Sequence, residues 1–360
     1  MRVPRLGYKA CVSVGILLAV VICASSLANA SSYKPAFLTA DQSGFAPNTD
    51  PNLINPWGIS FSSTGPFWVS DNNSGLSTIY NGTGKPQSLV VTIPPVGGAT
   101  SGTPTGTVFN GTTGFVVSKN GKSAPAAFLF DSEDGSISGW SPTVDATNAV
   151  VAVDNSGVSA VYKAVELANN GTGDFLYVCN FFSAKIEVYN NNFVQVSLAG
   201  SFTDPNLPAG FAPHNIRNIG GQLWVAYAKQ NATKTDAVLG PGLGLVDIFD
   251  LNGNFIKRFA SRGKLNAPWG LALAPATFGT FANDILIGNL GDGKITAYDP
   301  VSGVVKGQLA KAGGIVIVLK GLWGLTFGNG GSGGSKDVLY FTAGPGAYAH
   351  GRFGSITFVP

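Results

Sequence analysis

The sequence predicts an all-β protein, a six-bladed β-propeller, and three observations lead to this prediction. The chain of 360 residues contains 49 Gly and 21 Pro, with 44% hydrophobic and 11% charged residues, a composition that favours turn-rich β structure around a sizeable core. A Trp-Gly-aliphatic unit occurs three times, at Trp57, Trp269 and Trp323. Short β-rich segments recur with it at a period of roughly fifty residues, which is typical of propellers and other repeat arrays.

Six copies of this unit can be aligned on the tryptophan. The column reads Trp57, Thr105, Lys163, His214, Trp269 and Trp323, with spacings of 48, 58, 51, 55 and 54 residues. Each copy continues with a second β-rich segment, which begins at Phe67, Phe128, Leu176, Leu223, Ile285 or Leu339. A third segment follows after a turn rich in Gly, Asn and Asp, and a fourth is expected before the next copy, for example at residues 255–260. Four strands per copy predict one blade each.

The two ends of the chain are predicted to meet in one blade. The last copy ends at Pro360, just after its third strand, and the apolar segment at residues 34–40 precedes the first copy. We expect this segment to supply the missing outer strand and so to close the ring. In the three copies that carry it, the Trp-Gly pair is expected to begin the innermost strand, where the indole fills space between blades and Gly permits close approach of backbones.

The N-terminal residues have the pattern of a signal peptide. A basic start, an apolar run at residues 12–22 and Ala28-Asn29-Ala30 before Ser31 predict a signal peptide at residues 1–30 and a single propeller domain at residues 31–360. The apolar run is short for a membrane span, and no later stretch is long enough for one. We therefore expect a secreted chain, extracellular or periplasmic, without a membrane span. Cleavage would leave Cys179 alone, buried as a small hydrophobe.

The charge pattern argues against nucleic acid as a partner. The formal net charge is +3, and no cluster of Lys and Arg could neutralise a row of phosphates.

Candidate site residues come from positions where the copies differ, because shared positions are occupied with packing. The tryptophan column departs from its pattern at Lys163 and at His214, which is followed by Asn215. Three positions further on, Glu166 and Arg217 stand in neighbouring blades, and we expect them to pair beside or within the central channel. The pair either joins two blades or helps to bind a ligand.

A second candidate column ends the second strand of five copies. It consists of Asp71, Asp131, Asn180, Tyr227 and Asn289. In a propeller the start of the first strand and the end of the second lie on one face. We therefore expect this column to surround the mouth of the channel that Lys163 and His214 also approach. The alternative is that these Asp and Asn side chains only bond the backbone of local turns.

Three long segments carry a resemblance to a known family. They are "FTDPNLPAGFAPHNI", "GPGLGLVDIFDLNGNF" and "LNAPWGLALAPATFG", and with them nearly all of the mature chain resembles a family of uncharacterised secreted proteins, some with a C-terminal PEP-CTERM sorting tail. This chain has no such terminal segment. More distantly, the strand pattern is similar to NHL repeats and to lactonase propellers related to gluconolactonase, which hold a divalent metal with a Glu, two Asn and an Asp. Asp71, Asn180 and Asn289 match three of these types, but no Glu begins a first strand.

Two functions follow as hypotheses. Because the chain has no nucleophile elbow, phosphate loop, zinc-ligand spacing or EF-hand, we assign no catalytic residue, no metal site and no cofactor. The first hypothesis is a non-catalytic binding module whose polar mouth and long loops hold a peptide, a glycan or a surface protein. The alternative is a lactonase-like hydrolase or lyase, with a divalent cation such as calcium on Asp71, Asn180 and Asn289, and His214 or Lys163 moving protons.

Overall fold

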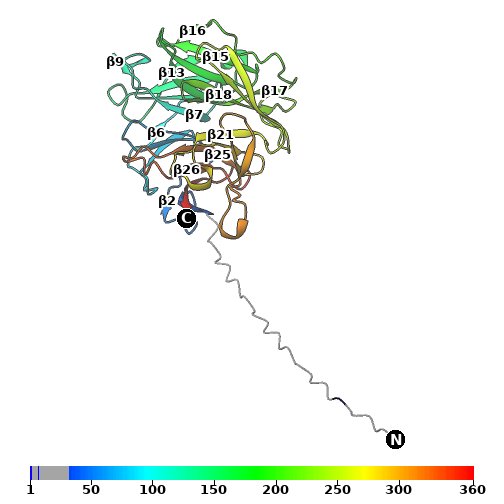
Figure 1. The fold of residues 1–360 in the computed structure, drawn as a ribbon. Coiled ribbons are helices and arrows are strands. Elements are labelled where there is room, and N and C mark those ends of the chain that lie inside the picture. The colour runs from blue at the N-terminus through cyan, green and yellow to red at the C-terminus, as the bar shows by residue number, and fades with distance from the viewer. Residues whose placement is uncertain (2–6, 8–31) are drawn as a thin grey trace.

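The computed structural model describes Met1, Gly7 and residues 32–360. The predicted signal peptide lies outside the described residues, apart from Met1 and Gly7. Six antiparallel blades succeed one another along residues 32–360 and pack into one ring (Figure 1). The predicted fold class is confirmed.

Blades 1 to 3 occupy the first half of the described chain. Blade 1 contains β3 (Pro56–Ser60), β4 (Phe67–Asp71), β5 (Leu76–Tyr80) and β6 (Val91–Thr92). Blade 2 contains β7 (Pro104–Phe109), β10 (Phe128–Ser132), β11 (Ser136–Trp140) and β12 (Val150–Asp154). Blade 3 contains β13 (Tyr162–Asn169), β14 (Asp174–Asn180), β15 (Lys185–Asn190) and β16 (Gln195–Val196). A small hairpin that the repeat pattern does not predict, β8 (Val116–Lys119) with β9 (Lys122–Pro125), interrupts blade 2.

Blades 4 to 6 complete the ring. Blade 4 contains β17 (Phe211–Ile219), β18 (Gln222–Lys229), β19 (Gly244–Phe249) and β20 (Phe255–Ser261). Blade 5 contains β21 (Pro268–Leu273), β22 (Ile285–Asn289), β23 (Ile295–Tyr298) and β24 (Val305–Gln308). Blade 6 contains β25 (Leu322–Phe327), β26 (Leu339–Ala343), β27 (Arg352–Val359) and β1 (Ser32–Ala40), with β2 (Asn48–Thr49) beside β1.

The described helices are short and of the 3-10 type. They are η1 (Ser156–Val158), η2 (Gly279–Phe281) and η3 (Ala312–Gly314). Within the described part of the chain, none of the helices has the length and apolar character needed to cross a membrane.

The ring closes as the sequence predicts. Strand β1 pairs antiparallel with β27, from Ser32 opposite Val359 to Ala40 opposite Arg352, so the two ends of the described chain share blade 6. Figure 1 shows β2 and the C-terminus close together at the lower edge of the ring. Asp41, just after β1, ties this closure to β27 through a 2.7 Å hydrogen bond from Arg352.

The innermost strands β3, β7, β13, β17, β21 and β25 contact one another in turn around the axis. The first strand of most blades has an irregularity next to the tryptophan column, for example between Pro56 and Ile59. Such bulges re-aim side chains and bring backbones together. At Gly58, a Cβ atom would lie 2.6 Å from the carbonyl oxygen of Thr105 in the next blade, so the expected close approach at this Gly is confirmed.

The three tryptophans meet on the axis itself. The rings of Trp57 and Trp323 stack with centroids 3.5 Å apart, and Trp269 meets both edge-on, with centroids 6.3 and 5.9 Å away. All three are buried. We expected the rings to fill space between neighbouring blades; in addition they form a floor across the channel, because their strands converge at the axis.

Candidate functional site

The strand register shows where the second candidate column lies. Its members at the end of the second strand pair with the residue just before the tryptophan column: Pro56 with Asp71, Tyr162 with Asn180, Pro213 with Tyr227 and Pro268 with Asn289. In blade 2 the partner of Pro104 is Ser132, so Asp131 lies one position earlier than our alignment placed it.

The side chains of this column are engaged within their own blades. Asp71 Oδ2 accepts hydrogen bonds from the backbone and the hydroxyl of Thr78, at 3.1 and 2.7 Å. Asn180 donates to Glu187 at 2.7 Å, and Asn289 donates to the Lys264 carbonyl at 2.7 Å. These bonds correspond to the alternative that we left open, namely local backbone and turn chemistry.

Asp131 and Tyr227 are buried in the blades. Asp131 Oδ1 accepts a 2.6 Å hydrogen bond from the backbone N–H of Gly106, and its Oδ2 has no partner among the described residues. Burial raises the pKa of this carboxyl group to about 7, although the hydrogen bond from Gly106 acts in the opposite direction. Burial also raises the pKa of the Tyr227 hydroxyl.

An open cavity of about 350 Å³ lies where the innermost strands begin. We call it the first mouth; Lys163 and His214 line it together with Trp57, Trp323, Glu133 and Asp236, and the loop residues Asn55, Asn72, Asn73 and Tyr348 contribute to its wall. The structure thus brings together two of the predicted residues with several that we did not predict.

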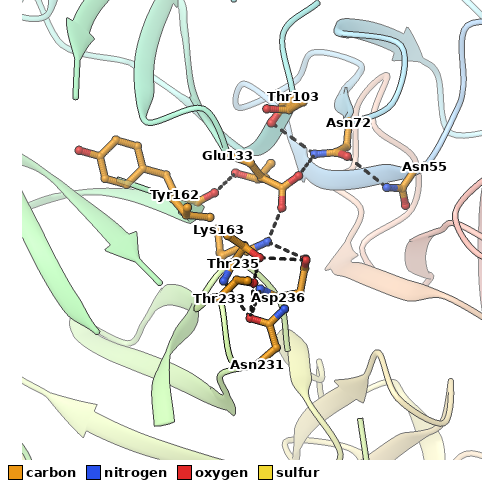
Figure 2. A network of polar contacts seen from close by, with 12 residues as sticks. Asn55, Asn72, Thr103, Glu133, Tyr162, Lys163, Asn231, Thr233, Thr235 and Asp236 are labelled. Carbon is orange, nitrogen blue, oxygen red and sulfur yellow. Dashed lines mark hydrogen bonds and ion pairs between the residues drawn. The ribbon is translucent and has the colours of Figure 1, made fainter. Parts of the chain in front are cut away.

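Lys163 is the centre of a polar network in this mouth, which Figure 2 shows. Its side chain is only 1% exposed, and its Nζ donates to the carboxylate of Glu133 and lies 3.4 Å from Asp236 Oδ1. The same nitrogen lies 5.1 Å from the centroid of the Trp57 ring, a cation-π distance. A buried ammonium group requires such compensation, because moving the charged group out of water without a counter-charge costs roughly several kcal/mol.

The network continues from Glu133 across blades 1 and 6. Glu133 Oε2 accepts from Asn72 at 2.9 Å, and Asn72 Oδ1 accepts from Asn55 at 3.2 Å (Figure 2). Asn55 Oδ1 in turn accepts from the indole N–H of Trp323 at 3.0 Å. Sequence analysis missed Glu133, although the acidic turn directly after the second strand of copy 2 was a signal. It also missed Asp236, which comes from the long loop between β18 and β19.

His214 faces the first mouth as an uncharged ring. Its Nδ1 lies 2.9 Å from the carbonyl oxygen of Pro268, and since a carbonyl can only accept, Nδ1 carries the proton. Burial lowers the pKa of His214 to about 3. The neighbouring Asn215 donates instead to the Trp269 carbonyl and lines a small internal space of the channel.

Glu166 and Arg217 lie at the opposite end of the innermost strands, where we define the second mouth by these two residues. Glu166 Oε2 is 3.6 Å from Arg217 Nε, so the expected pairing is confirmed. Glu166 also accepts from the backbone N–H groups of Leu167 and Asn218, each at 3.2 Å. Burial raises the pKa of Glu166, and Arg217 offsets part of that rise.

The residues suggested for a cation come from three different blades. Asp71, Asn180 and Asn289 hold bonds in blades 1, 3 and 5 and do not line the first mouth. Among the residues that the structure describes, no group of three His, Cys, Asp or Glu side chains is arranged to hold a metal ion.

The fold and the first mouth define the class: a six-bladed β-propeller with a polar cavity at one end of its channel. Uncharacterized proteins R648 and L690 of Acanthamoeba polyphaga mimivirus are 32% and 33% identical to this chain over 302 residues. The matches cover 82% of this chain in both cases, with 74% of R648 and 79% of L690. The chain belongs to the family of these mimivirus proteins. No family model matches it.

Solved propellers of very different sequence share the fold. Streptogramin B lyase superimposes with a TM-score of 0.52 at 10% identity, over 91% of this chain and 98% of that one. A PQQ-bound aldose sugar dehydrogenase from Streptomyces coelicolor gives a TM-score of 0.52 at 12% identity, over 92% and 99%. At such low identity the likeness concerns the fold alone, because one fold hosts many functions.

Proposed function

We propose that this protein is a non-catalytic binding module that holds its ligand in the first mouth. The observation that carries the proposal is the buried Lys163, whose counter-charges arrive from the turn after β10 and from the loop after β18, beside an open cavity. The cavity, at about 350 Å³, is within the range of small-ligand sites. Polar groups that converge on such a space from three blades are suited to orienting a ligand.

Binding accounts for these groups better than catalysis does. His214 has a pKa of about 3, and its Nδ1–H donates to the carbonyl oxygen of Pro268. Lys163 forms ion pairs with two carboxylates. Neither group is therefore well suited to moving protons. The residues suggested for the cation of the hydrolase or lyase alternative, Asp71, Asn180 and Asn289, are already hydrogen-bonded and do not line the first mouth. That alternative therefore has less support than the binding module.

We also propose that the protein is exported to the extracellular space or the periplasm. There it would bind a peptide, a glycan or a surface protein. The signal-peptide pattern of residues 1–30 supports export. Mass spectrometry of the protein recovered from the medium or periplasm of expressing cells should give a mature chain that begins at Ser31. An intact N-terminus and retention in the cytoplasm would contradict this part.

The test of binding is a thermal-shift screen with amino acids, short peptides, amines and sugars. A ligand that binds only the folded state raises the melting temperature in a saturable way. We expect such a ligand for the natural chain and loss of the shift in both Asp236→Ala and Tyr348→Ala, which change two residues that line the first mouth. Leu273→Ala, an exposed position at the second mouth, is the matched control and should bind normally. Saturable binding retained in both mouth variants, or the absence of any binding ligand, would overturn the proposal.

A further inference from the structure

We infer that the first mouth recognises an alkylammonium group, presented as a lysine side chain by an extended peptide segment. This inference rests on the proposed binding function and names the ligand of the same site. It depends on the balance of charge in the mouth, on its aromatic walls and on a neighbouring groove.

Negative charge exceeds positive charge in the first mouth. Of the described residues that line the mouth, Glu133 and Asp236 are the carboxylates and Lys163 is the one ammonium group that faces them. His214 adds no charge at neutral pH, because its ring is neutral above a pKa of about 3. A cationic ligand would restore the balance, whereas an anion would meet an excess of like charge.

Asp236 is the carboxylate with room for an incoming cation. Glu133 is already engaged by Lys163 and Asn72. The side chain of Asp236 is 69% exposed, and its Oδ1 lies 3.4 Å from Lys163 Nζ. From the rest of the described chain, this carboxylate accepts only a 3.3 Å hydrogen bond from the hydroxyl of Thr235. Since a carboxylate can accept about four hydrogen bonds, Asp236 retains unused acceptor capacity at the rim of the cavity.

Aromatic rings next to Asp236 suit an alkylammonium group. Lys163 already places its Nζ 5.1 Å from the Trp57 centroid and 5.7 Å from the Phe181 centroid, so this mouth accommodates one ammonium group against rings. The ring of Tyr348 is half-buried, and its centroid lies 5.9 Å from that of Trp323. This ring is available to contact a second cation. Besides burial, the charges of Asp236 and Glu133 raise the pKa of Tyr348, which reflects the negative field at its hydroxyl.

The backbone holds Tyr348 over the mouth in an unfavourable conformation. Ala347 and Tyr348 have φ angles of 54° and 69°, in the left-handed region that non-glycine residues rarely adopt. Asn73 donates a 2.9 Å hydrogen bond to the carbonyl oxygen of Tyr348 and fixes the loop there. This hydrogen bond keeps the loop, and with it Tyr348, in the wall of the first mouth.

A second cavity, of about 360 Å³, continues from the first mouth across blades 5 and 6. The two cavities share Leu239, Leu290, Ala347 and Tyr348. The second is lined by several glycines, among them the half-buried Gly291 and the exposed Gly346, and its charged groups, Asp292 and Lys320, balance each other. Exposed backbone in a groove lets an extended chain approach closely, which favours a peptide over a free amine or an amino sugar.

The test compares three blocked pentapeptides, acetyl-Gly-Leu-X-Leu-Gly-amide, in which X is lysine, norleucine or glutamate. Isothermal titration should show saturable binding of the lysine peptide, at least about tenfold weaker binding of the norleucine peptide, and weaker binding of the lysine peptide at high salt. Glucosamine and butylammonium, titrated in parallel, should bind more weakly than the lysine peptide because they leave the second cavity empty.

The matched variants are Asp236→Asn and Asp154→Asn, each of which removes one exposed carboxylate. Asp236→Asn should weaken the lysine peptide about tenfold and leave the norleucine peptide unchanged, whereas Asp154→Asn, on the outer strand of blade 2, should change neither. Equal or tighter binding of the norleucine or glutamate peptide, or tighter binding of glucosamine, would overturn the inference and leave the binding function intact. If no peptide, amine or sugar binds saturably, the proposed function itself fails.

Discussion

The two mouths of the channel lie at opposite ends of the same innermost strands, yet they handle charge differently. In the first mouth, loops bring Glu133 and Asp236 to Lys163, and the charges do not balance. In the second mouth, Glu166 and Arg217 come from the strands themselves and form a balanced pair. The comparison teaches that strands supply a self-sufficient contact, whereas loops supply groups with capacity left for a ligand.

The surroundings of the two mouths differ in the same sense. Large apolar side chains stand four positions after the tryptophan column in five blades, around Glu166 and Arg217. They are Phe61, Phe109, Leu167, Leu273 and Phe327. The first mouth instead combines aromatic rings with asparagines and charged groups.

The largest expected effect is that of Trp57→Ala. This change removes the stacked partner of Trp323 from the floor of the first mouth and should lower the free energy of unfolding by about 3–5 kcal/mol. Phe109→Ala at the second mouth, where the ring is 36% exposed, should cost about 1 kcal/mol or less. Urea denaturation measures both. Equal losses of stability would mean that the two ends of the channel are packed alike, which would contradict the difference between the two mouths.

A second effect concerns the pH dependence of stability. Asp131 has a pKa raised to about 7 in the folded protein, so its stabilising contribution is complete below the unfolded value near 3.8 and is lost as pH rises through 7. The free energy of unfolding should fall between pH 5 and pH 8, by about 2–3 kcal/mol more in the natural chain than in Asp131→Asn. Parallel pH profiles of the two proteins, from urea denaturation, would show that this carboxyl group does not titrate in that range.

The smallest effect is expected at the second mouth. Arg217→Met leaves the buried Glu166 carboxylate with two backbone N–H donors but no guanidinium, at a cost of about 1 kcal/mol at pH 8. Because the loss of Arg217 raises the pKa of Glu166 further, the defect should shrink as pH falls. The double variant Glu166→Gln, Arg217→Met should recover most of the stability in the same denaturation assay. A defect independent of pH would point to lost packing of the arginine instead.

The fold could be predicted in detail because five of the six blades are built from neighbouring segments of the chain, and the sixth lacked one strand in the repeat pattern. Residues 255–260, predicted as an outer strand, form β20, and residues 34–40 close the ring within β1. The β8–β9 hairpin and β2 were not predicted, since they occur in one blade each and leave no trace in the repeat.

The candidate site could be predicted only in part. Lys163 and His214 were found because each breaks a column of repeated residues. Their partners lie in turns and loops, where the repeat has no fixed length, and Glu133 and Asp236 are 30 and 73 residues from Lys163. Asp131 was misaligned by one position because the register shifts between Phe130 and Ser132.

The sequence by itself determined the ring, its closure and the positions that depart from the repeat, because strand pairing within a blade is local and periodic. Only the tertiary structure decided which of the residues that depart from the repeat lie close together. Lys163 and Glu166 are three residues apart on β13, a rise of about 10 Å, which puts them at opposite ends of the channel. Three-dimensional convergence of loops then gave one end a cavity and an excess of negative charge, a result that no periodicity along the chain encodes.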